Sequence, residues 1–78
     1  MKSKTLSRYQ HEQLRLLGQY FRELRFVSGL TQEELSQNTN VHYRTIQRLE
    51  QGENVTALSI IEIADTMGID IIKELLGN

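Results

Sequence analysis

Cysteine and proline are both absent from this 78-residue chain, and aromatic residues make up only 6% of it. Without cysteine there is no disulfide, no thiolate metal site and no cysteine nucleophile, and the simplest location is the reducing cytoplasm. Without proline, no helix is interrupted on that account. No hydrophobic run approaches the roughly 20 residues of a membrane span, and no signal-peptide pattern follows the first residue. We therefore expect a cytoplasmic protein that does not contact a membrane.

Motifs for catalysis and cofactor binding are also missing. The two histidines, His11 and His42, belong to no metal or nucleophile motif, and there is no glycine-rich nucleotide loop. A chain of 9.1 kDa forms one domain and has little room for a large enclosed cleft. The adjacent carboxylates Glu33 and Glu34 fit a helix cap and a surface position better than a catalytic pair. The sequence thus predicts no enzyme, no metal, no cofactor and no small-molecule substrate.

The charges are unevenly distributed, although the formal net charge is only −1. Up to Arg48 there are eight basic and four acidic residues, a net charge of +4, whereas one basic and six acidic residues follow, a net charge of −5. The net value alone argues weakly against a nucleic-acid partner, but such an asymmetry indicates binding that the net value conceals. A chance scatter of solvated charges is the alternative.

Helix-like runs cover most of the chain, and no strand pattern is present. Four of the five glycines follow such a run, at the position where a left-handed residue commonly ends a helix. We expect an all-α fold in residues 10–78, preceded by a flexible basic arm at residues 1–9. The expected helices cover residues 10–28, 31–38 with the cap included, 43–51, 56–67 and 71–76.

The sharpest local signal lies at the start of the second helix. Thr31 and Glu34 fit a capping box, in which a hydroxyl and a carboxylate each accept from a free backbone N–H. Asn40 offers the left-handed conformation that a tight turn needs, and Val41 is an apolar anchor after it. His42 then stands at the N-cap of the next helix. Two short helices around a turn of this length form a helix-turn-helix.

The helix expected at 43–51 has one apolar and one polar face. Ile46 and Leu49 define its inner arc, and the outer arc holds only hydrogen-bonding side chains. These outer residues are Tyr43, Arg44, Gln47, Arg48 and Gln51. Arginine and glutamine can read guanine and adenine edges in a major groove, and an anionic partner would relieve the repulsion between the two arginines. On composition alone, a solvated face explains the outer arc equally well.

Two charged residues lie on apolar arcs. Arg25 falls within the apolar stripe of the first helix, between Phe21 and Ser28, and Glu50 lies at the edge of the inner arc of 43–51. A lone buried charge is costly, so we expect Arg25 and Glu50 to form a buried ion pair. The alternative is that both side chains extend to water. Gly18 lies in the same stripe and would let another helix approach closely.

The C-terminal part has more apolar side chains than one small core requires. Leu58 and Ile61 point away from the expected core face of 56–67, and the run 71–76 has a wide apolar arc. We predict self-association as a homodimer through Leu58, Ile61, Ile72 and Leu76. The alternative is that the core uses all of these side chains.

The spacing of these signals resembles a known family. The similarity is carried by four segments, LTQEEL at 30–35, NV at 40–41, IQRLEQG at 46–52 and IADTMG at 63–68. Together they resemble the phage-repressor and Cro-like helix-turn-helix family, also called the XRE family, over residues 14–76. The resemblance implies a compact five-helix lambda-repressor-like domain, usually dimeric, that binds DNA and regulates transcription.

The resemblance also implies roles for single residues. The helix at 43–51 would enter the major groove of a double-stranded DNA operator, and the ion pair would match one that is buried in the family. Phosphate contacts would involve Gln32 and, in the loop where the family often has a basic residue, Asn54. The remaining residues that would face bases or phosphates are His42, Tyr43, Arg44, Gln47 and Arg48.

The sequence is compatible with two functions that belong to different classes of protein. The first is a sequence-specific transcriptional regulator that occupies an operator, of the stand-alone Cro or controller kind. The second is a protein-interaction module, antitoxin-like or adaptor, that uses the same helix face on an acidic protein partner. Salt-sensitive duplex binding with a sequence preference separates the two.

Overall fold

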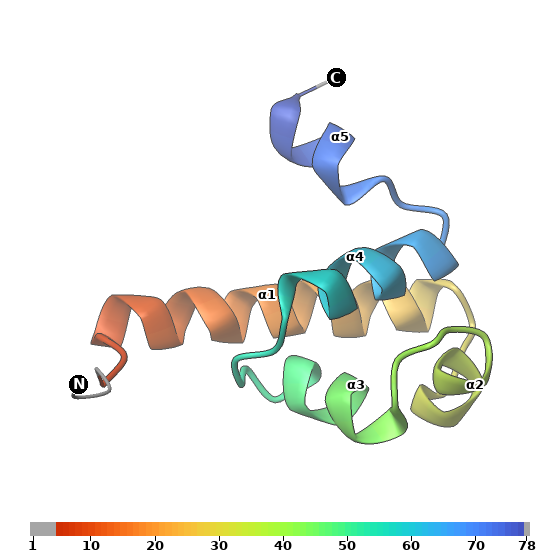
Figure 1. Cartoon of the computed structure of the whole chain (residues 1–78), viewed down its shortest axis with the longest axis horizontal. Helices are drawn as coiled ribbons and strands as arrows, with labels where there is room; N and C mark the ends of the chain where they lie inside the picture. The colour runs from red at the N-terminus through yellow and green to blue at the C-terminus, as the bar shows by residue number, and fades with distance from the viewer. Residues whose placement is uncertain (1–4, 78) are drawn as a thin grey trace.

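The computed structural model of the chain describes residues 5–77 (Figure 1). Within that range the protein contains five α-helices and no β-strand, which confirms the all-α fold class. The helices are α1 (Arg8–Val27), α2 (Gln32–Gln37), α3 (Tyr43–Glu50), α4 (Ala57–Thr66) and α5 (Ile71–Leu76). None of them is both long enough and apolar enough to cross a membrane.

The first helix begins two residues earlier than the sequence analysis placed it. Ser7 Oγ accepts a hydrogen bond of 3.0 Å from the backbone N–H of Gln10, and Gln10 Oε1 accepts one of 2.9 Å from the backbone N–H of Ser7. This capping box satisfies two free donors at the start of α1. Arg8 and Tyr9 are therefore helical and do not belong to an arm. Of the rest of the expected arm, residues 5–7 precede the helix and residues 1–4 lie outside the described residues.

The helix-turn-helix forms where it was expected, with one difference in the turn. The Thr31–Glu34 capping box is present, with hydrogen bonds of 3.0 and 2.9 Å. Val41 is buried and anchors the turn. Among the described residues only glycines have a positive φ, so the left-handed conformation expected of Asn40 is wrong. The turn is long enough to reverse the chain without it, because four residues separate the cap of α2 at Asn38 from α3.

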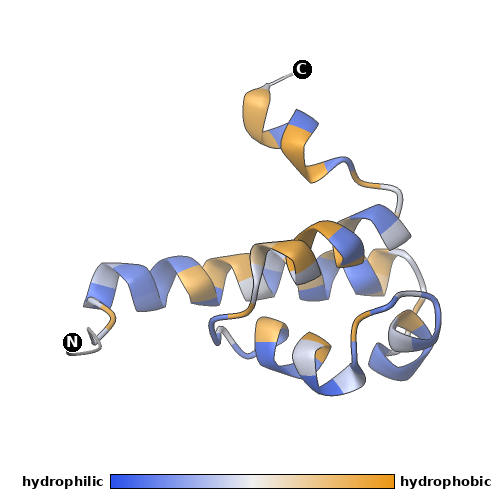
Figure 2. Cartoon of the chain, viewed as in Figure 1, coloured by the Kyte–Doolittle hydropathy of each residue, from blue (hydrophilic) through white to orange (hydrophobic). Residues whose placement is uncertain are grey.

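The core lies where α1, α3 and α4 meet α2. The largest fully buried side chains come from all four helices and are Phe21, Leu35, Ile46, Leu49 and Ile63. Figure 2 shows the apolar segments of these helices turned toward one another. Ser28, which the sequence analysis placed in the core stripe, is exposed because it caps the C-terminus of α1, where its hydroxyl donates to the carbonyl of Leu24. The two core-facing residues of α3, Ile46 and Leu49, hold its opposite face toward solvent.

Close backbone approach fixes α3 against α1. Gly18 is buried, and a Cβ atom there would collide with the backbone oxygen of Leu49. Gly52 ends α3 with φ +84°, and its N–H donates to the Leu49 carbonyl while the N–H of Glu53 donates to the carbonyl of Arg48. A side chain at Gly52 would also press on the Arg15 backbone. Glycine at 18 and 52 thus lets the end of α3 lie directly on α1, as the sequence analysis expected of Gly18.

The C-terminal helix is placed very differently. Figure 1 shows α5 projecting away from the other four helices, and none of its residues is buried. Ile71 packs partly against the core, whereas Leu75 and Leu76 are exposed. On α4, Leu58 is 63% exposed and Ile61 is exposed as well. The apolar side chains that the sequence analysis counted as surplus are therefore not used by the core of this chain.

Candidate nucleic-acid interface

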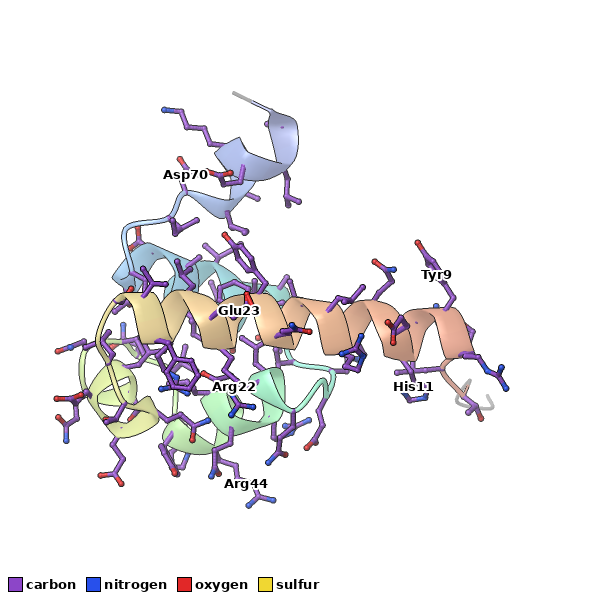
Figure 3. The ribbon with its side chains drawn as sticks, turned by 180° about the vertical axis from the view of Figure 1, so that it is seen from behind. Tyr9, His11, Arg22, Glu23, Arg44 and Asp70 are labelled. Atoms are coloured by element: carbon purple, nitrogen blue, oxygen red, sulfur yellow. The ribbon has the colours of Figure 1, made fainter. Side chains whose placement is uncertain are left out.

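The outer face of α3 carries the polar side chains that were predicted for its outer arc. Arg44 is exposed, and Figure 3 shows it projecting from α3 away from the body of the molecule. Tyr43 and Gln47 are half-buried, and Gln47 Nε2 donates a hydrogen bond of 3.2 Å to Tyr43 Oη. This bond restrains both side chains on the helix surface. The face therefore presents the exposed guanidinium of Arg44 beside an oriented amide, a pair that can meet the edges of bases.

His42 caps α3 at the end nearest to the turn. Its Nδ1 accepts a hydrogen bond of 3.0 Å from the backbone N–H of Arg44. A nitrogen that accepts carries no proton, so the neutral ring has its N–H at Nε2. The exposed ring can thus offer one donor to an anion while it holds the start of α3. The N-cap position predicted for His42 is confirmed.

Arg48 is oriented toward the loop after α3. Its Nε donates to Glu53 Oε1 at 3.1 Å, and its Nη2 donates to the backbone oxygen of Asn54 at 3.0 Å. The side chains of Arg48 and Glu53 are 43% and 50% exposed. Arg48 therefore differs from Arg44, since a carboxylate already partly neutralises it. This contact was not predicted from the sequence.

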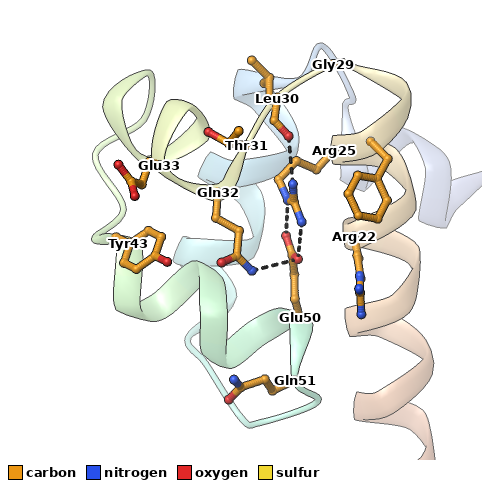
Figure 4. A pocket seen from close by; sticks show the side chains of 11 residues that line it. Arg22, Arg25, Gly29, Leu30, Thr31, Gln32, Glu33, Tyr43, Glu50 and Gln51 are labelled. Atoms are coloured by element: carbon orange, nitrogen blue, oxygen red, sulfur yellow. Dashed lines mark hydrogen bonds and ion pairs between the residues drawn. The ribbon is translucent and has the colours of Figure 1, made fainter.

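A buried network joins α1, the start of α2 and the end of α3 (Figure 4). Arg25 Nε lies 2.7 Å from Glu50 Oε2, and Arg25 Nη2 lies 2.9 Å from Glu50 Oε1, with only 8% and 5% of the two side chains exposed. Arg25 Nη1 donates to the Leu30 carbonyl at 2.8 Å. Bidentate pairing of this kind is strong and directional. The Arg25–Glu50 contact matches the buried pair expected from the sequence.

The same network includes Gln32. Its Nε2 donates to Glu50 Oε1 at 3.1 Å, so the carboxylate of Glu50 is shared between an arginine and an amide. Hydrogen bonding to Glu50 is the main cause that raises the pKa of the Arg25 guanidinium above its ordinary value, and burial opposes it. Arg25 thus stays charged at every physiological pH. Gln32 was expected to contact a phosphate, and the structure adds that one of its amide hydrogens fixes it to the core network.

Sequence reasoning missed Arg22 as a candidate contact. Its guanidinium carbon lies 5.6 Å from the centroid of the Phe26 ring, and that of Arg25 lies 4.7 Å from the same ring. Arg22 is exposed and lines a groove of about 690 Å³ between α1, α2 and α3, together with Gln32, Tyr43 and other residues. In Figure 3, Arg22 and Arg44 lie on the same side of α1. The sequence signal that could have identified Arg22 is its position one helical turn before Arg25.

The acidic residues do not form a metal centre within residues 5–77. No group of three or more histidine, aspartate or glutamate side chains is placed there to hold an ion. Of the acids that follow Leu49, Glu50 is buried and Glu53 pairs with Arg48 beside α3, whereas the other four lie on α4, on α5 or at the cap of α5. The exposed face of α3 is therefore the site that the geometry singles out.

Two short helices around a fixed turn, the second with a polar outer face, define a helix-turn-helix domain of the DNA-binding class. The chain belongs to the XRE-type helix-turn-helix family, whose "Helix-turn-helix" family model matches residues 22–73. It is also similar to the uncharacterized HTH-type transcriptional regulator y4dJ of Sinorhizobium fredii (strain NBRC 101917 / NGR234), with 32% identity over 60 residues. That alignment covers 76% of this chain and 78% of the relative. The findings confirm the family expected from the sequence and support a DNA-binding regulator.

Proposed function

We propose that this protein is a sequence-specific regulator of transcription that inserts α3 into the major groove of a double-stranded DNA operator. The observation that carries the proposal is the geometry of α3. Its apolar side is held against α1 by close backbone contact at Gly18 and by the Arg25–Glu50 pair. Its other side presents Arg44 and the oriented amide of Gln47. A rigidly held helix with such a face meets the geometric needs of base readout.

The residues of the face divide into two kinds of contact. Arg44 and Gln47 would contact base edges, with Tyr43 packing beside them. His42 would approach a phosphate through Nε2, because Nδ1 is engaged in the cap. The remaining phosphate contacts would come from Gln32 at the start of α2 and from Asn54 in the loop after α3. Phosphate contacts fix the register of the protein on the duplex, and base contacts give the sequence preference.

We further propose that the regulator acts as a homodimer in the cytoplasm. The support for a dimer is the exposed apolar surface of Leu58, Ile61, Ile72 and Leu76, which the core of one chain leaves uncovered. A two-fold dimer through α5 and the outer side of α4 would place two α3 helices about 34 Å apart, one turn of DNA. The operator would then be an inverted repeat.

Selection of bound sequences from a random duplex library tests the proposal. We expect enrichment of one short motif that occurs as an inverted repeat. As a matched control, the Arg44→Ala, Gln47→Ala double variant keeps the fold, because both side chains lie outside the core. It should bind library duplexes without enriching the motif. If the unmodified protein enriches nothing and binding is absent at low salt, the alternative of an acidic protein partner takes over.

A further inference from the structure

The loop after α3 folds back on Arg48 and contacts both its backbone and its side chain. Through the backbone, the N–H of Glu53 donates to the Arg48 carbonyl at 2.9 Å. Through side chains, Arg48 Nε donates to Glu53 Oε1 and Arg48 Nη2 donates to the Asn54 carbonyl. The positive φ of Gly52 makes this reversal possible. Glu53 is therefore held next to Arg48 by the way in which α3 ends.

Arg48 also lines a shallow hollow that suits an anion. The hollow has a volume of about 390 Å³, and its other lining residues include the hydroxyl side chains Thr45, Thr56 and Ser59. These residues bring no negative charge. A carboxylate and a phosphodiester are both oxygen acceptors for a guanidinium, so they compete for the same N–H groups. The only carboxylate paired with Arg48 among the described residues is Glu53.

We propose that Glu53 competes with a DNA phosphate for Arg48 and thereby limits the affinity of the protein for every duplex. This inference rests on the proposed function, and it assigns Arg48 to the backbone of the duplex, leaving base reading to Arg44 and Gln47. Glu53 is a positioning residue, because it acts on DNA through Arg48. The protein therefore gains specificity relative to affinity, since a contact common to all sequences is weakened while base contacts are not.

The size of the effect follows from the exposure of the pair. Both side chains are about half exposed, so the ion pair is weak and a phosphate can displace it. While Glu53 lies beside Arg48, the pair brings little net positive charge to the duplex and releases few of the cations that are bound to the DNA. Without Glu53, the full charge of Arg48 would neutralise a phosphate and release its counterion. Removal of Glu53 should therefore tighten binding and also increase the salt dependence, by up to about one unit in the slope of log affinity against log salt.

The experiment compares Glu53→Gln with Glu62→Gln by titration of duplexes at several salt concentrations. Glu62 lies on α4 and takes part in none of the ion pairs among the described residues, so it controls for the loss of one negative charge. On both a preferred and a mixed-sequence duplex, we expect Glu53→Gln to raise the affinity roughly two- to five-fold, the range set by an exposed pair. Glu62→Gln should change the affinity less and leave the salt slope unaltered. In an Arg48→Ala background, the gain from Glu53→Gln should shrink to that of the control.

Each outcome decides the matter. An equal gain from Glu53→Gln with and without Arg48, or equal gains from the two glutamate variants, shows a long-range charge effect and overturns the proposal. A loss of affinity in Glu53→Gln shows that the carboxylate prepares Arg48 for DNA, and it overturns the proposal as well. The unmodified protein is titrated in the same series. If it binds no duplex, the proposed function and this inference fail together, whereas duplex binding with either overturning pattern contradicts the inference alone.

Discussion

The junction of α1 with α3 and the region of α4 and α5 differ in how much of their surface is buried. Where α3 meets α1, backbone lies on backbone at Gly18, and the Arg25–Glu50 pair is almost fully buried. Where α4 leads to α5, no residue of α5 is buried and Leu76 is 70% exposed. The contacts of the first region are buried within one chain, whereas the apolar side chains of the second region are exposed to solvent. The chain therefore fixes the position of α3 within a single copy, whereas the apolar side chains of α5 remain exposed.

The same contrast separates two arginine–glutamate pairs, one that joins α1 to α3 and one that joins α3 to the loop after it. Arg25–Glu50 is bidentate and lies under the helix, and Arg48–Glu53 lies on its outer side in water. Burial raises the penalty for removing one partner, because the other charge is left without compensation in a medium that solvates it poorly. An exposed pair has water as a substitute. The same two residue types thus form a buried structural pair in one place and, by our proposal, a pair that adjusts DNA binding in the other.

The largest expected effect comes from breaking the buried pair. Arg25→Met or Glu50→Gln should lower the free energy of unfolding by about 3–5 kcal/mol, because each change leaves one buried polar partner unmatched. Urea denaturation followed by circular dichroism measures this. Glu53→Gln is the matched control, since it removes a glutamate from an exposed arginine pair, and it should change stability by less than about 1 kcal/mol. Equal losses in Glu50→Gln and Glu53→Gln would show that burial of the first pair is unimportant.

The next largest effect concerns the exposed apolar side chains of α4 and α5. If Leu58 is covered in a two-fold dimer, Leu58→Lys removes two buried leucines per dimer and should weaken association by about 3 kcal/mol, with little change in the fold. Sedimentation at micromolar concentration measures it. Val27→Lys is the control, because Val27 is an exposed apolar residue on α1, outside the predicted interface. An unmodified protein that sediments as a monomer and binds DNA with single-site stoichiometry contradicts the dimer.

A smaller effect on stability is expected from a variant that disturbs the close approach of α1 and α3. A Cβ atom at position 18 meets the backbone of Leu49 and Glu50, which cannot move aside as a flexible side chain could. We expect Gly18→Ala to destabilise the protein by about 1–2 kcal/mol, although alanine is the better helix former by about 1 kcal/mol. Gln19→Ala, at the exposed neighbouring position, should stay within about 0.5 kcal/mol. A Gly18→Ala variant as stable as the unmodified protein contradicts the tight junction.

Much of the fold was readable because its signals are local. The capping box of Thr31 and Glu34 and the glycine after each of several helices act through neighbouring residues, so sequence spacing alone locates them. The Arg25–Glu50 pair was accessible for another reason: two charges on apolar arcs each require a partner. The start of α1 was misplaced because the pattern Ser7-x-x-Gln10 was overlooked, although it is a capping box of the same kind.

The parts that the sequence did not predict depend on where the chain returns in space. The contact of Gln32 with Glu50 and that of Arg48 with the loop at Asn54 need the actual path of the backbone. Asn40 was given a left-handed conformation from its residue type, but the turn reaches α3 without one. The groove beside Arg22 is formed by three helices, so no single segment encodes it. Residue type and spacing gave the candidates for the site, and only the fold showed how each is engaged.

Base reading by the outer face of α3 can be tested in a single comparison. Duplex binding of the unmodified protein, Arg44→Ala, Gln47→Ala and Gln32→Ala is compared over a panel of single-base variants of the selected operator. We predict that Arg44→Ala and Gln47→Ala each lose about 1–3 kcal/mol of discrimination at one base position, whereas Gln32→Ala weakens all duplexes alike. If Arg44→Ala and Gln47→Ala both leave affinity and sequence preference unchanged, α3 is not a reading helix and the account is contradicted.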